Sequence, residues 1–521
     1  MSVLAHVGDV LATYARHFPD KIGAADLDRR MTFRQWYGRA CRLANALIGL
    51  GLGKGDRVCV LAYNCIEWLE IYVAAALAGV VAVPVNFRLT GPEVRYIVDN
   101  SEARALIVQD ELLGIVESVR GDLAVPDGNF VLLGQGKAAP GYRAYEDLLA
   151  RARDNAPSLA VNAADPWTLM YTSGTTGKPK GAIRSHRGGA MLSLVTDIEL
   201  GLARTDAALL VMPMCHANSL YFFGAFSYLG AACTVYNRKS FDPEHLVRTL
   251  AEGGATFTSL VPTHYIMMLG LPETTRALYD VSAVTKLMIS SAPARRDTKL
   301  GIMEYFRNSG LFELYGSTEA GWVTMLHPDE QFTQLGSVGR ECVGSRPIRL
   351  LDPDGNEVPD GEAGELYSCN DYTFGGYWRL PEKTREAFRG DYCTVGDLAR
   401  RDEQGYIFLV DRKSNMIISG GENVYPSEVE GVLGGHPKVK DVAVIGIADE
   451  KWGERVHAVV IAREGETPTD VEILEWCKTR IAGYKRPRSV SFIREHEMPR
   501  TATGKILHRA LRTQFSGEKA T

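Results

Sequence analysis

Hydrophobic and polar positions in the first part of the chain alternate between a helical and a strand-like pattern. From Phe33 to Leu47 the apolar side chains recur every three or four residues, and Thr32 stands before them as a candidate N-cap. The apolar run 57–61 that follows predicts a buried strand. Repeated alternation of helices and strands is typical of βαβ units with a largely parallel sheet. Further strands are predicted at 105–109, 209–212, 256–260, 286–290 and 311–315, and further helices at 244–252 and 299–306.

The pattern changes at about residue 348, where short strand-like runs are separated by glycines, as in the stretch LDPDGNEVPDGEAGELYSC. Closely spaced turns of this kind favour antiparallel pairing. We therefore predict a small barrel-like β subdomain at about 336–412.

The polar segment 411–415 separates two β-rich runs and marks a predicted domain boundary. The residues after it mix helical and strand patterns. The predicted fold class is α/β: a large N-terminal domain of βαβ-type sheets at 1–412, which includes the β subdomain, and a smaller, mobile α+β domain at 413–521. In the C-terminal part, helices are predicted at 426–433 and 470–481 and strands at 442–445 and 456–462.

The composition is that of an ordinary globular protein, since 45% of its 521 residues are hydrophobic and 23% are charged. A formal net charge of −5 argues against a nucleic-acid-binding protein, which usually carries a basic excess. Nine cysteines, an odd number without a C-x-x-C pair, indicate neither a disulfide framework nor a zinc site and suit a reducing, cytoplasmic location. No stretch approaches ~18 uninterrupted apolar residues and the N-terminus lacks the apolar core of a secretory signal, so neither a membrane span nor a targeting segment is predicted.

A glycine-rich loop, YTSGTTGKPKGA, begins at Tyr171 after a short apolar run. Its glycines leave backbone N–H groups free to surround an anion, its hydroxyls add donors, and its two lysines add charge. It is not a Walker loop, because two residues rather than four separate Gly174 from Gly177 and a proline follows Lys178. A flexible surface turn is the alternative, but Pro179 stiffens the backbone where such a turn would gain nothing. The loop therefore predicts polyphosphate binding.

Three further motifs place polar side chains where a nucleotide could bind. YGSTE, from Tyr315, closes a predicted strand, and ligands of parallel sheets gather at the carboxyl ends of strands. YCTVGD ends in a single acid, Asp397, and PRTATGK ends in Lys505. With these motifs, nearly the whole chain resembles the adenylate-forming superfamily of acyl-CoA synthetases, luciferases and nonribosomal-peptide adenylation domains in motif order, spacing and length. The resemblance also rests on GDRVCVLAYN from Gly55, PMCHAN from Pro213, SSAPA from Ser290 and SGGENVYPSEVE from Ser419.

The resemblance implies an enzyme, an ATP-dependent, AMP-forming carboxylate–CoA ligase. In the first step a carboxylate attacks the α-phosphorus of ATP and gives an acyl-adenylate and pyrophosphate. In the second step the thiol of CoA takes the acyl group. The implied ligands are ATP, Mg²⁺, CoA and a small-molecule carboxylic acid.

The resemblance also assigns residues to the nucleotide. The loop 172–180 is expected on the β- and γ-phosphates and Tyr315 against adenine. Asp397 is expected to accept hydrogen bonds from the ribose hydroxyls, with Arg412 in support. The implied ATP-binding residues are Thr172, Ser173, Gly174, Thr175, Thr176, Gly177, Lys180, Ser291, Ala292, Pro293, Tyr315, Gly316, Asp397 and Arg412.

Four residues form the implied catalytic set. Lys505 is expected to bridge the substrate carboxylate and the α-phosphate, where charge builds as the bond forms. Thr318 is expected on the α-phosphate, Glu319 on Mg²⁺, which prefers carboxylate and phosphate oxygens, and His216 as a gate beside the acyl pocket. The stretch 499–505 also resembles contexts in which lysine acetylation silences bacterial synthetases by removing the charge. A lysine acetyltransferase or deacetylase acting on Lys505 therefore stays open as a partner, as does a second copy of the chain in a homodimer.

The second step is expected to use a loop of the C-terminal domain. The resemblance places Gly420, Gly421, Glu422 and Asn423 on the CoA channel, where a side chain in place of either glycine would obstruct the pantetheine arm. The C-terminal domain is expected to rotate between the two steps. Ser414 occupies the hinge position, which is usually aspartate or lysine, so no hinge salt bridge is carried over.

The segment after His216 bears on which acid is activated. Amino-acid adenylation domains place an aspartate next, whereas here Ala217 follows and no acid occurs before Phe241, which disfavours an amino acid. The stretch 218–226 is apolar and aromatic and has no Arg or Lys for a second carboxylate, which disfavours diacids. An apolar monocarboxylate, aliphatic or aromatic, is therefore predicted, although the stretch also fits a plain core helix. The predicted acyl pocket consists of His216, Asn218, Tyr221, Phe222 and Trp322.

Two alternatives stay open. A luciferase-like oxygenase would share the motifs of adenylation but would need no thiol, and the glycine pair argues against it. The unusual Ser414 suggests the second alternative. The protein could then be catalytically silent, complete only the first half-reaction, or pass the acyl group to another acceptor such as a carrier protein. Chain length, pathway and the contacts of the CoA 3′-phosphate are not readable from the motifs.

Overall fold

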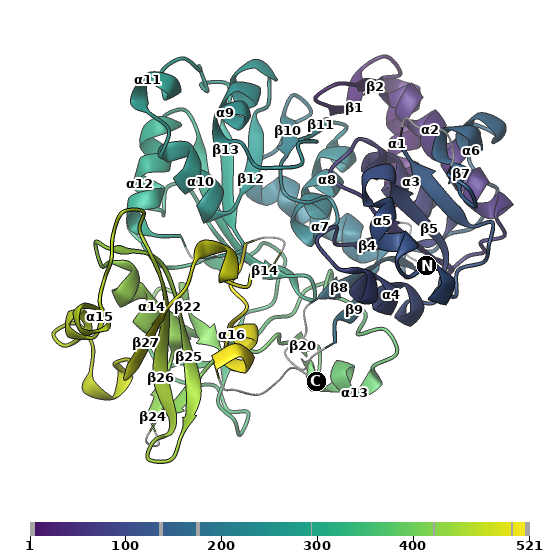
Figure 1. Cartoon of the computed structure of the whole chain (residues 1–521). Helices are drawn as coiled ribbons and strands as arrows, with labels where there is room; N and C mark the ends of the chain where they lie inside the picture. The colour runs from purple at the N-terminus through teal and green to yellow at the C-terminus, as the bar shows by residue number, and fades with distance from the viewer. Residues whose placement is uncertain are drawn as a thin grey trace. The chain divides into compact units, whose positions relative to one another are not determined.

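The computed structural model describes residues 6–134, 139–172, 178–292, 294–419, 422–501 and 504–515. It divides into two compact units, Met1–Pro347 with Ser368–Cys393 and Ile348–Tyr367 with Thr394–Thr521 (Figure 1). The larger first unit contains mostly parallel sheets with helices, and the smaller second unit combines mainly antiparallel sheets with helices. The predicted α/β fold class is therefore confirmed, whereas the domain boundary at 412/413 stays a prediction.

The first sheet of the larger unit is parallel at its centre and antiparallel at its edges. Among the described residues its strand order is β16-β15-β14-β13-β12-β10-β11-β1-β2, and every pairing from β14 to β1 is parallel. The carboxyl ends of β12, β13 and β14 therefore lie at one edge, where ligands of such sheets bind. The strands are β1 (Ile22–Asp26), β2 (Arg30–Thr32), β10 (Ala207–Leu210), β11 (Ala232–Val235), β12 (Phe257–Leu260), β13 (Lys286–Ser290), β14 (Gly310–Ser317), β15 (Gly321–Leu326) and β16 (Arg340–Glu341).

The second sheet carries the glycine-rich loop. Its order is β7-β6-β5-β3-β4-β8-β9 in the part of the chain that the structure describes, with β8 and β9 as the antiparallel pair. Two short strands, β19 (Phe388–Arg389) and β20 (Tyr392–Cys393), pair separately in the same unit. The strands of the second sheet are β3 (Arg57–Leu61), β4 (Val81–Val85), β5 (Ala103–Gln109), β6 (Phe130–Leu133), β7 (Arg143–Ala144), β8 (Pro166–Thr172) and β9 (Lys180–Ser185).

Helix α2 of the larger unit begins where a local signal predicts. Thr32 caps α2 in a capping box with Gln35, as the sequence predicts. The helices are α1 (Val7–His17), α2 (Phe33–Gly49), α3 (Glu67–Ala78), α4 (Gly91–Asn100), α5 (Leu113–Glu117), α6 (Tyr145–Arg151), α7 (His186–Leu200), α8 (Ala217–Leu229), α9 (Pro243–Glu252), α10 (Pro262–Leu269), α11 (Glu273–Arg276), α12 (Arg296–Tyr305) and α13 (Pro381–Glu386).

Helices α3 and α8 lie in the core of this unit. Every residue of α3 is buried, as is α8 from Ala217 to Ser227. Both helices share one hydrophobic cluster with residues of both sheets, such as Val60 of β3 and Leu210 of β10. A helix that is buried on all sides has an apolar sequence all round. The aromatic stretch 218–226 is therefore part of a core helix. A core helix can also line an acyl pocket, so the two interpretations of this stretch are compatible.

The smaller unit contains two sheets. Strands β17-β18-β21-β22 form one antiparallel sheet, and β24-β23-β26-β25 form the other, with β27 parallel to β26. Its strands are β17 (Arg349–Leu351), β18 (Gly364–Tyr367), β21 (Asp397–Arg401), β22 (Ile407–Arg412), β23 (Ile417–Ser419), β24 (Glu422–Val424), β25 (Val439–Asp449), β26 (Gly453–Ala462) and β27 (Ser489–Phe492), and its helices are α14 (Pro426–Gly434), α15 (Asp470–Cys477) and α16 (His508–Phe515).

Several predicted elements have different bounds in the structure; helix α12, for example, begins at Arg296 rather than at residue 299. Strand β10 stops at Leu210 rather than at 212, and the carbonyl of Met212 accepts a hydrogen bond from the Ser219 hydroxyl at 2.6 Å. Helix α15 stops at Cys477 rather than at 481. There the Arg480 guanidinium, and not the main chain, donates to the carbonyl of Trp476 at 2.9 Å.

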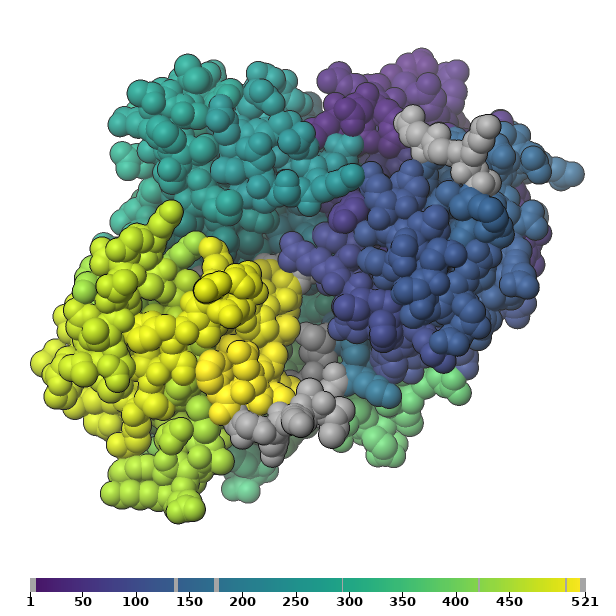
Figure 2. All heavy atoms as spheres, in the orientation of Figure 1, coloured from purple at the N-terminus to yellow at the C-terminus, as the bar shows by residue number. Residues whose placement is uncertain are grey.

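Part of the surface of the larger unit is apolar. Ile266, Met267 and Leu278 are 51%, 42% and 74% exposed. They belong to the segment of α10 and α11, which contributes to the teal surface in Figure 2. No described helix is long and apolar enough to cross a membrane.

Candidate active site

The glycine-rich loop is the tip of a β-hairpin. Strands β8 and β9 pair so that Thr172 lies opposite Lys180, which brings both ends of the loop together. Residues outside the hairpin hold each end in place. Ser173, Gly174, Thr175, Thr176 and Gly177 lie outside the described residues, so their predicted phosphate contacts stay a prediction.

Helix α4 holds both ends of this loop. The Tyr171 hydroxyl donates to Asn100 Oδ1 at 2.6 Å, and the Tyr96 hydroxyl donates to the carbonyl of Pro179 at 3.1 Å. The Lys178 ammonium lies over the Tyr96 ring, 5.3 Å from its centroid. No sequence motif indicated this support, because Tyr96 and Asn100 are part of an ordinary amphipathic helix pattern.

Lys180 and Glu319 meet at Tyr377. The Lys180 ammonium lies 4.0 Å from the centroid of the Tyr377 ring, a cation–π contact. Burial lowers the pKa of Lys180, and the negative charge of Glu319 opposes that shift. Tyr377 therefore joins the glycine-rich loop to the YGSTE motif, a role that no sequence motif indicated.

The Glu319 carboxylate is fixed on one side only. It is 7% exposed, and its Oε1 accepts hydrogen bonds from the Thr172 hydroxyl at 3.0 Å and the Tyr377 hydroxyl at 2.9 Å. No partner of Oε2 is found among the described residues. No cluster of three or more His, Cys, Asp or Glu that could hold a metal lies in the described part of the chain. This donor set fits Mg²⁺, which binds through one or two carboxylates and substrate phosphates rather than in an all-protein cage.

Arg184 lies beneath the YGSTE motif. It is 1% exposed, and its Nη1 donates to the carbonyls of Thr318 and Glu319 at 3.2 and 3.1 Å. Its Nε and Nη2 have no hydrogen-bond partner in the described structure. The guanidinium also lies over the ring of Tyr221, 5.2 Å from the centroid. The stretch 218–226 contains no basic residue, as the sequence shows, but β9 brings a cation to it from outside.

The predicted adenine-binding residues lie at the carboxyl ends of neighbouring strands. Ser290 pairs with Leu314 across the parallel strands β13 and β14, so Ser291 and Tyr315 follow at adjoining strand ends. Ser291 has a left-handed φ of 71°, a strained conformation for a residue with a side chain. Ala292 and Gly316 are exposed there, and Pro293 lies outside the described residues.

His216 caps helix α8. Its Nδ1 accepts a hydrogen bond from the Asn218 N–H at 3.3 Å, and burial lowers its pKa to about 4, so the ring is neutral at pH 7. Burial raises the pKa of the neighbouring Cys215 thiol to about 12, which agrees with its interpretation as a packing residue rather than a nucleophile. The capping role was missed, because histidine is not among the usual N-cap residues.

The other predicted acyl-pocket residues form an aromatic group. The Tyr221 and Trp322 rings meet edge to face with centroids 5.1 Å apart, and Phe222 lies 5.4 Å from Trp322. The Tyr221 hydroxyl donates to the carbonyl of Thr318 at 3.3 Å, which connects this group to the YGSTE motif. Trp322 is held by Thr196, whose hydroxyl accepts from the indole N–H at 2.7 Å.

In the smaller unit, Asp397 and Arg412 lie side by side. They are paired across β21 and β22, and the Arg412 Nε lies 3.0 Å from Asp397 Oδ1. Ser414 is exposed in the turn that follows. Glu422 and Asn423 are exposed on β24, and Gly420 and Gly421 lie outside the described residues.

Lys505 lies at the end of a closed loop in the same unit. Thr501 and Lys505 exchange two hydrogen bonds, from the Thr501 N–H to the Lys505 carbonyl at 2.8 Å and from the Lys505 N–H to the Thr501 hydroxyl at 3.1 Å. Desolvation lowers the pKa of Lys505 to about 8; the charge of Arg412 adds to this shift, and Asp397 and Asp411 oppose it.

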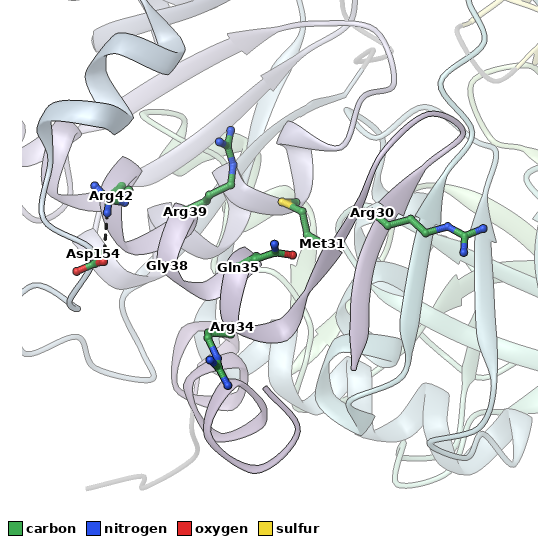
Figure 3. Close-up of a pocket in the computed structure, with 8 residues that line it drawn as sticks. All are labelled: Arg30, Met31, Arg34, Gln35, Gly38, Arg39, Arg42 and Asp154. Atoms are coloured by element: carbon green, nitrogen blue, oxygen red, sulfur yellow. Dashed lines mark hydrogen bonds and ion pairs between the residues drawn. The ribbon is translucent and has the colours of Figure 1, made fainter. Parts of the chain in front are cut away.

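A surface pocket of 340 Å³ lies away from these motifs, with four arginines among its lining residues (Figure 3). Three of the arginines are already paired with acids, and one of them is Arg34, whose Nη2 lies 3.4 Å from Asp20. Arg42 bonds to Asp154 at 3.1 Å, and Arg39 bonds to Glu70 and Glu146, each at 2.6 Å. None of the predicted site residues lines this pocket.

Comparison with known proteins covers both units. The AMP-binding enzyme family matches residues 11–378, and the AMP-binding enzyme C-terminal domain matches residues 428–505. A feruloyl-CoA synthase of an Amycolatopsis species is 36% identical over 507 residues, 97% of this chain and 96% of the relative. A long-chain-fatty-acid–CoA ligase of Mycobacterium tuberculosis is 34% identical over 494 residues, 94% of each chain. Among solved structures, an anthranilate CoA ligase in complex with anthranoyl-AMP has a TM-score of 0.89 at 28% identity and covers 99% of this chain and 98% of its own.

Proposed function

We propose that this chain, which belongs to the AMP-binding enzyme family and is an AMP-forming CoA ligase of the adenylate-forming superfamily, activates an apolar monocarboxylic acid, aliphatic or aromatic. The acid and ATP give an acyl-adenylate and pyrophosphate, and the thiol of CoA then displaces AMP. The named relatives act on an aromatic acid and on fatty acids, which supports an apolar substrate without choosing between the two.

The arrangement around Glu319 is the observation that carries the proposal. A buried carboxylate, held at Oε1 by Thr172 and Tyr377, adjoins the end of a hairpin loop rich in donors. Such a group can hold the polyphosphate end of ATP together with a divalent cation. When bound, Mg²⁺ would neutralise charge on the departing pyrophosphate. Lys180, kept beside the loop by Tyr377, contributes a fixed positive charge there.

The smaller unit is proposed to supply the remaining groups. Asp397, which forms an ion pair with Arg412, would accept hydrogen bonds from the ribose hydroxyls, because a carboxylate has about four lone-pair sites. Lys505 would stabilise the charge that develops between the acid and the α-phosphate. The segment 420–423 would guide the pantetheine arm, after rotation of the C-terminal part about Ser414.

An apolar acid suits the aromatic group on α8 and β15. Tyr221, Phe222 and Trp322 supply ring faces and edges, and the hydroxyl and indole N–H of Tyr221 and Trp322 are already satisfied within the protein. An apolar chain or ring of the substrate can therefore bind against Tyr221 and Trp322 without breaking a hydrogen bond. A cytosolic location, a homodimer and regulation by acetylation of Lys505 stay predictions.

A pyrophosphate-release assay tests the proposal. Straight-chain, branched and aryl monocarboxylates are each assayed with ATP and Mg²⁺, with and without CoA. We expect multiple turnovers that depend on one class of acid and on CoA. Release of about one equivalent that CoA does not change would instead favour an enzyme that completes only the first half-reaction or uses another acceptor.

A further inference from the structure

A small polar cluster interrupts the apolar surroundings of α8. Asn218, Ser259 and Ser290 are 5%, 4% and 5% exposed. The Asn218 Nδ2 donates to the hydroxyls of Ser259 and Ser290, each at 3.0 Å. Buried polar groups in an apolar region are costly unless their hydrogen bonds are complete.

The hydrogen bonding of Asn218 is not complete. Its Oδ1 has no partner in the described structure and is shielded from solvent. If the amide were reversed, its oxygen would accept from the two serine hydroxyls, and the nitrogen would then be the end without a partner. One end of this amide therefore lacks a partner in either orientation.

The cluster connects a predicted acyl-binding residue, Asn218, to the strand end that precedes the predicted nucleotide-binding Ser291. Asn218 is three residues before Tyr221 on α8 and therefore shares its face, and the Tyr221 hydroxyl bonds to the carbonyl of Thr318. Ser290 is the last residue of β13 and precedes Ser291, whose left-handed backbone is strained. Strain of this kind and unsatisfied buried polar groups gather at ligand sites.

A hydroxyl group matches this amide best. A hydroxyl both donates and accepts, so it completes the Asn218 amide in either orientation. An ammonium group would need a carboxylate, and none bonds to the cluster in the described residues. A second substrate carboxylate would need a cation, and the three members of the cluster are all uncharged.

We infer that Asn218 binds a hydroxyl group on the acid, so that the substrate is an otherwise apolar acid with one hydroxyl substituent. This inference rests on the proposed function and narrows it. Asn218 acts here as a residue that determines specificity, while the two serines orient its amide.

Matched pairs of acids test the inference. Cinnamate, benzoate and straight-chain acids are each compared with hydroxylated counterparts in the pyrophosphate-release assay with CoA. For the preferred pair, we expect kcat/KM to be about 10- to 100-fold higher for the hydroxylated acid, because an acid without the hydroxyl group leaves the buried Asn218 amide unpaired. Equal or better turnover of the unsubstituted acid in every pair would overturn the inference and leave the proposed function intact. Without acid-dependent release from any compound, the proposed function itself fails and the inference with it.

Two variants separate specificity from folding. Asn218→Leu should lose most of the preference, because kcat/KM should fall about 10-fold or more further for the hydroxylated acid than for the unsubstituted acid. Asn218→Ala serves the same purpose if the leucine variant does not melt cooperatively. Ser227→Ala is the matched control, because Ser227 is also on α8 and its buried hydroxyl also lacks a partner in the described structure. An equal loss for both acids of the pair would mean that Asn218 serves only the packing of α8 and would overturn the inference.

Discussion

At the scale of single residues, Arg184 is the clearest case of a side chain whose role depends on its tertiary neighbours. Its Nη1 bonds to two consecutive carbonyls, at Thr318 and Glu319, and so sets the direction of the peptide that carries the predicted magnesium ligand. Displacement of a site residue by about 1 Å can cost ~10²-fold in rate. We therefore predict that Arg184 acts as a positioning residue.

Arg184→Met should keep the packing volume and lose both hydrogen bonds. We expect kcat for pyrophosphate release to fall by about 10- to 100-fold, with a smaller change in KM for ATP. Arg184→Lys should recover part of the loss, since one ammonium can reach the same carbonyls. Arg187→Met is the control, because Arg187 is exposed and pairs only with Asp371 at the surface. Loss of activity that merely follows loss of melting temperature would contradict a positioning role.

Asp197 makes the stability of the fold depend on pH. Both of its oxygens are shielded and lack partners in the described structure, and burial raises its pKa to about 8. Its pKa in the unfolded chain is ~4, so between about pH 4 and pH 8 the folded state holds a proton that the unfolded state has released. The contribution of Asp197 to stability therefore falls as the pH rises through this range.

Asp197→Asn should remove this dependence. We expect the variant to gain stability over the wild type as the pH rises from 5 to 8, by on the order of 2–4 kcal/mol in the free energy of unfolding. Urea unfolding at three pH values measures the difference. Asp20→Asn, at a side chain that is 85% exposed, is the control and should show no such trend. A constant difference between Asp197→Asn and the wild type at all three pH values would disprove the assignment.

At the scale of elements, α4 acts as a support for the hairpin loop of β8 and β9. Its residues Tyr96 and Asn100 bond to opposite ends of the loop, through Pro179 and Tyr171. A loop held at both ends loses less conformational entropy when it closes on a ligand. The support should therefore act on nucleotide binding more than on the chemical step.

Tyr96→Phe tests this support, because it removes only the hydroxyl that bonds to Pro179. We expect KM for ATP to rise by about 3- to 10-fold with little change in kcat or in melting temperature. Tyr142→Phe is the control, since its hydroxyl bonds to Glu117 instead of to the loop. A fall in kcat at unchanged KM would argue that the loop acts in the chemical step.

Element boundaries also show where sequence patterns stop being informative. Helix α2 begins at its predicted cap because Thr32 and Gln35, which are close in sequence, form the capping box at its N-terminus. Helix α15 ends early because Arg480 folds back onto Trp476, 3.6 Å from the ring centroid, and this contact is not part of the apolar periodicity. Helix beginnings were also missed where no cap was recognised, since α12 begins at Arg296 rather than at residue 299.

At the scale of the whole molecule, the two half-reactions are expected to need different parts of the smaller unit. Lys505→Ala should abolish adenylate formation while ATP still binds, since the lysine is proposed to stabilise the charge of the first step. Ser414→Pro should slow the second step about 10-fold or more and spare the first, because proline fixes φ at the proposed hinge. Single-turnover assays with and without CoA separate the steps. Equal slowing of both steps by Ser414→Pro would contradict a hinge at this position.

The sequence by itself determined the family, the α/β fold class and the reaction type, because motif order and hydrophobic period are properties of contiguous residues. It also indicated Glu319 and the loop from Thr172 as candidates. Only the tertiary structure decided which residues contact them. Tyr377 donates a hydrogen bond to Glu319, and Arg184 donates to the carbonyl of Glu319. The structure also shows that Asn218 Oδ1 has no partner among the described residues. These contacts join segments far apart in the chain, and their geometry depends on how the sheets and α8 pack, which no local pattern encodes.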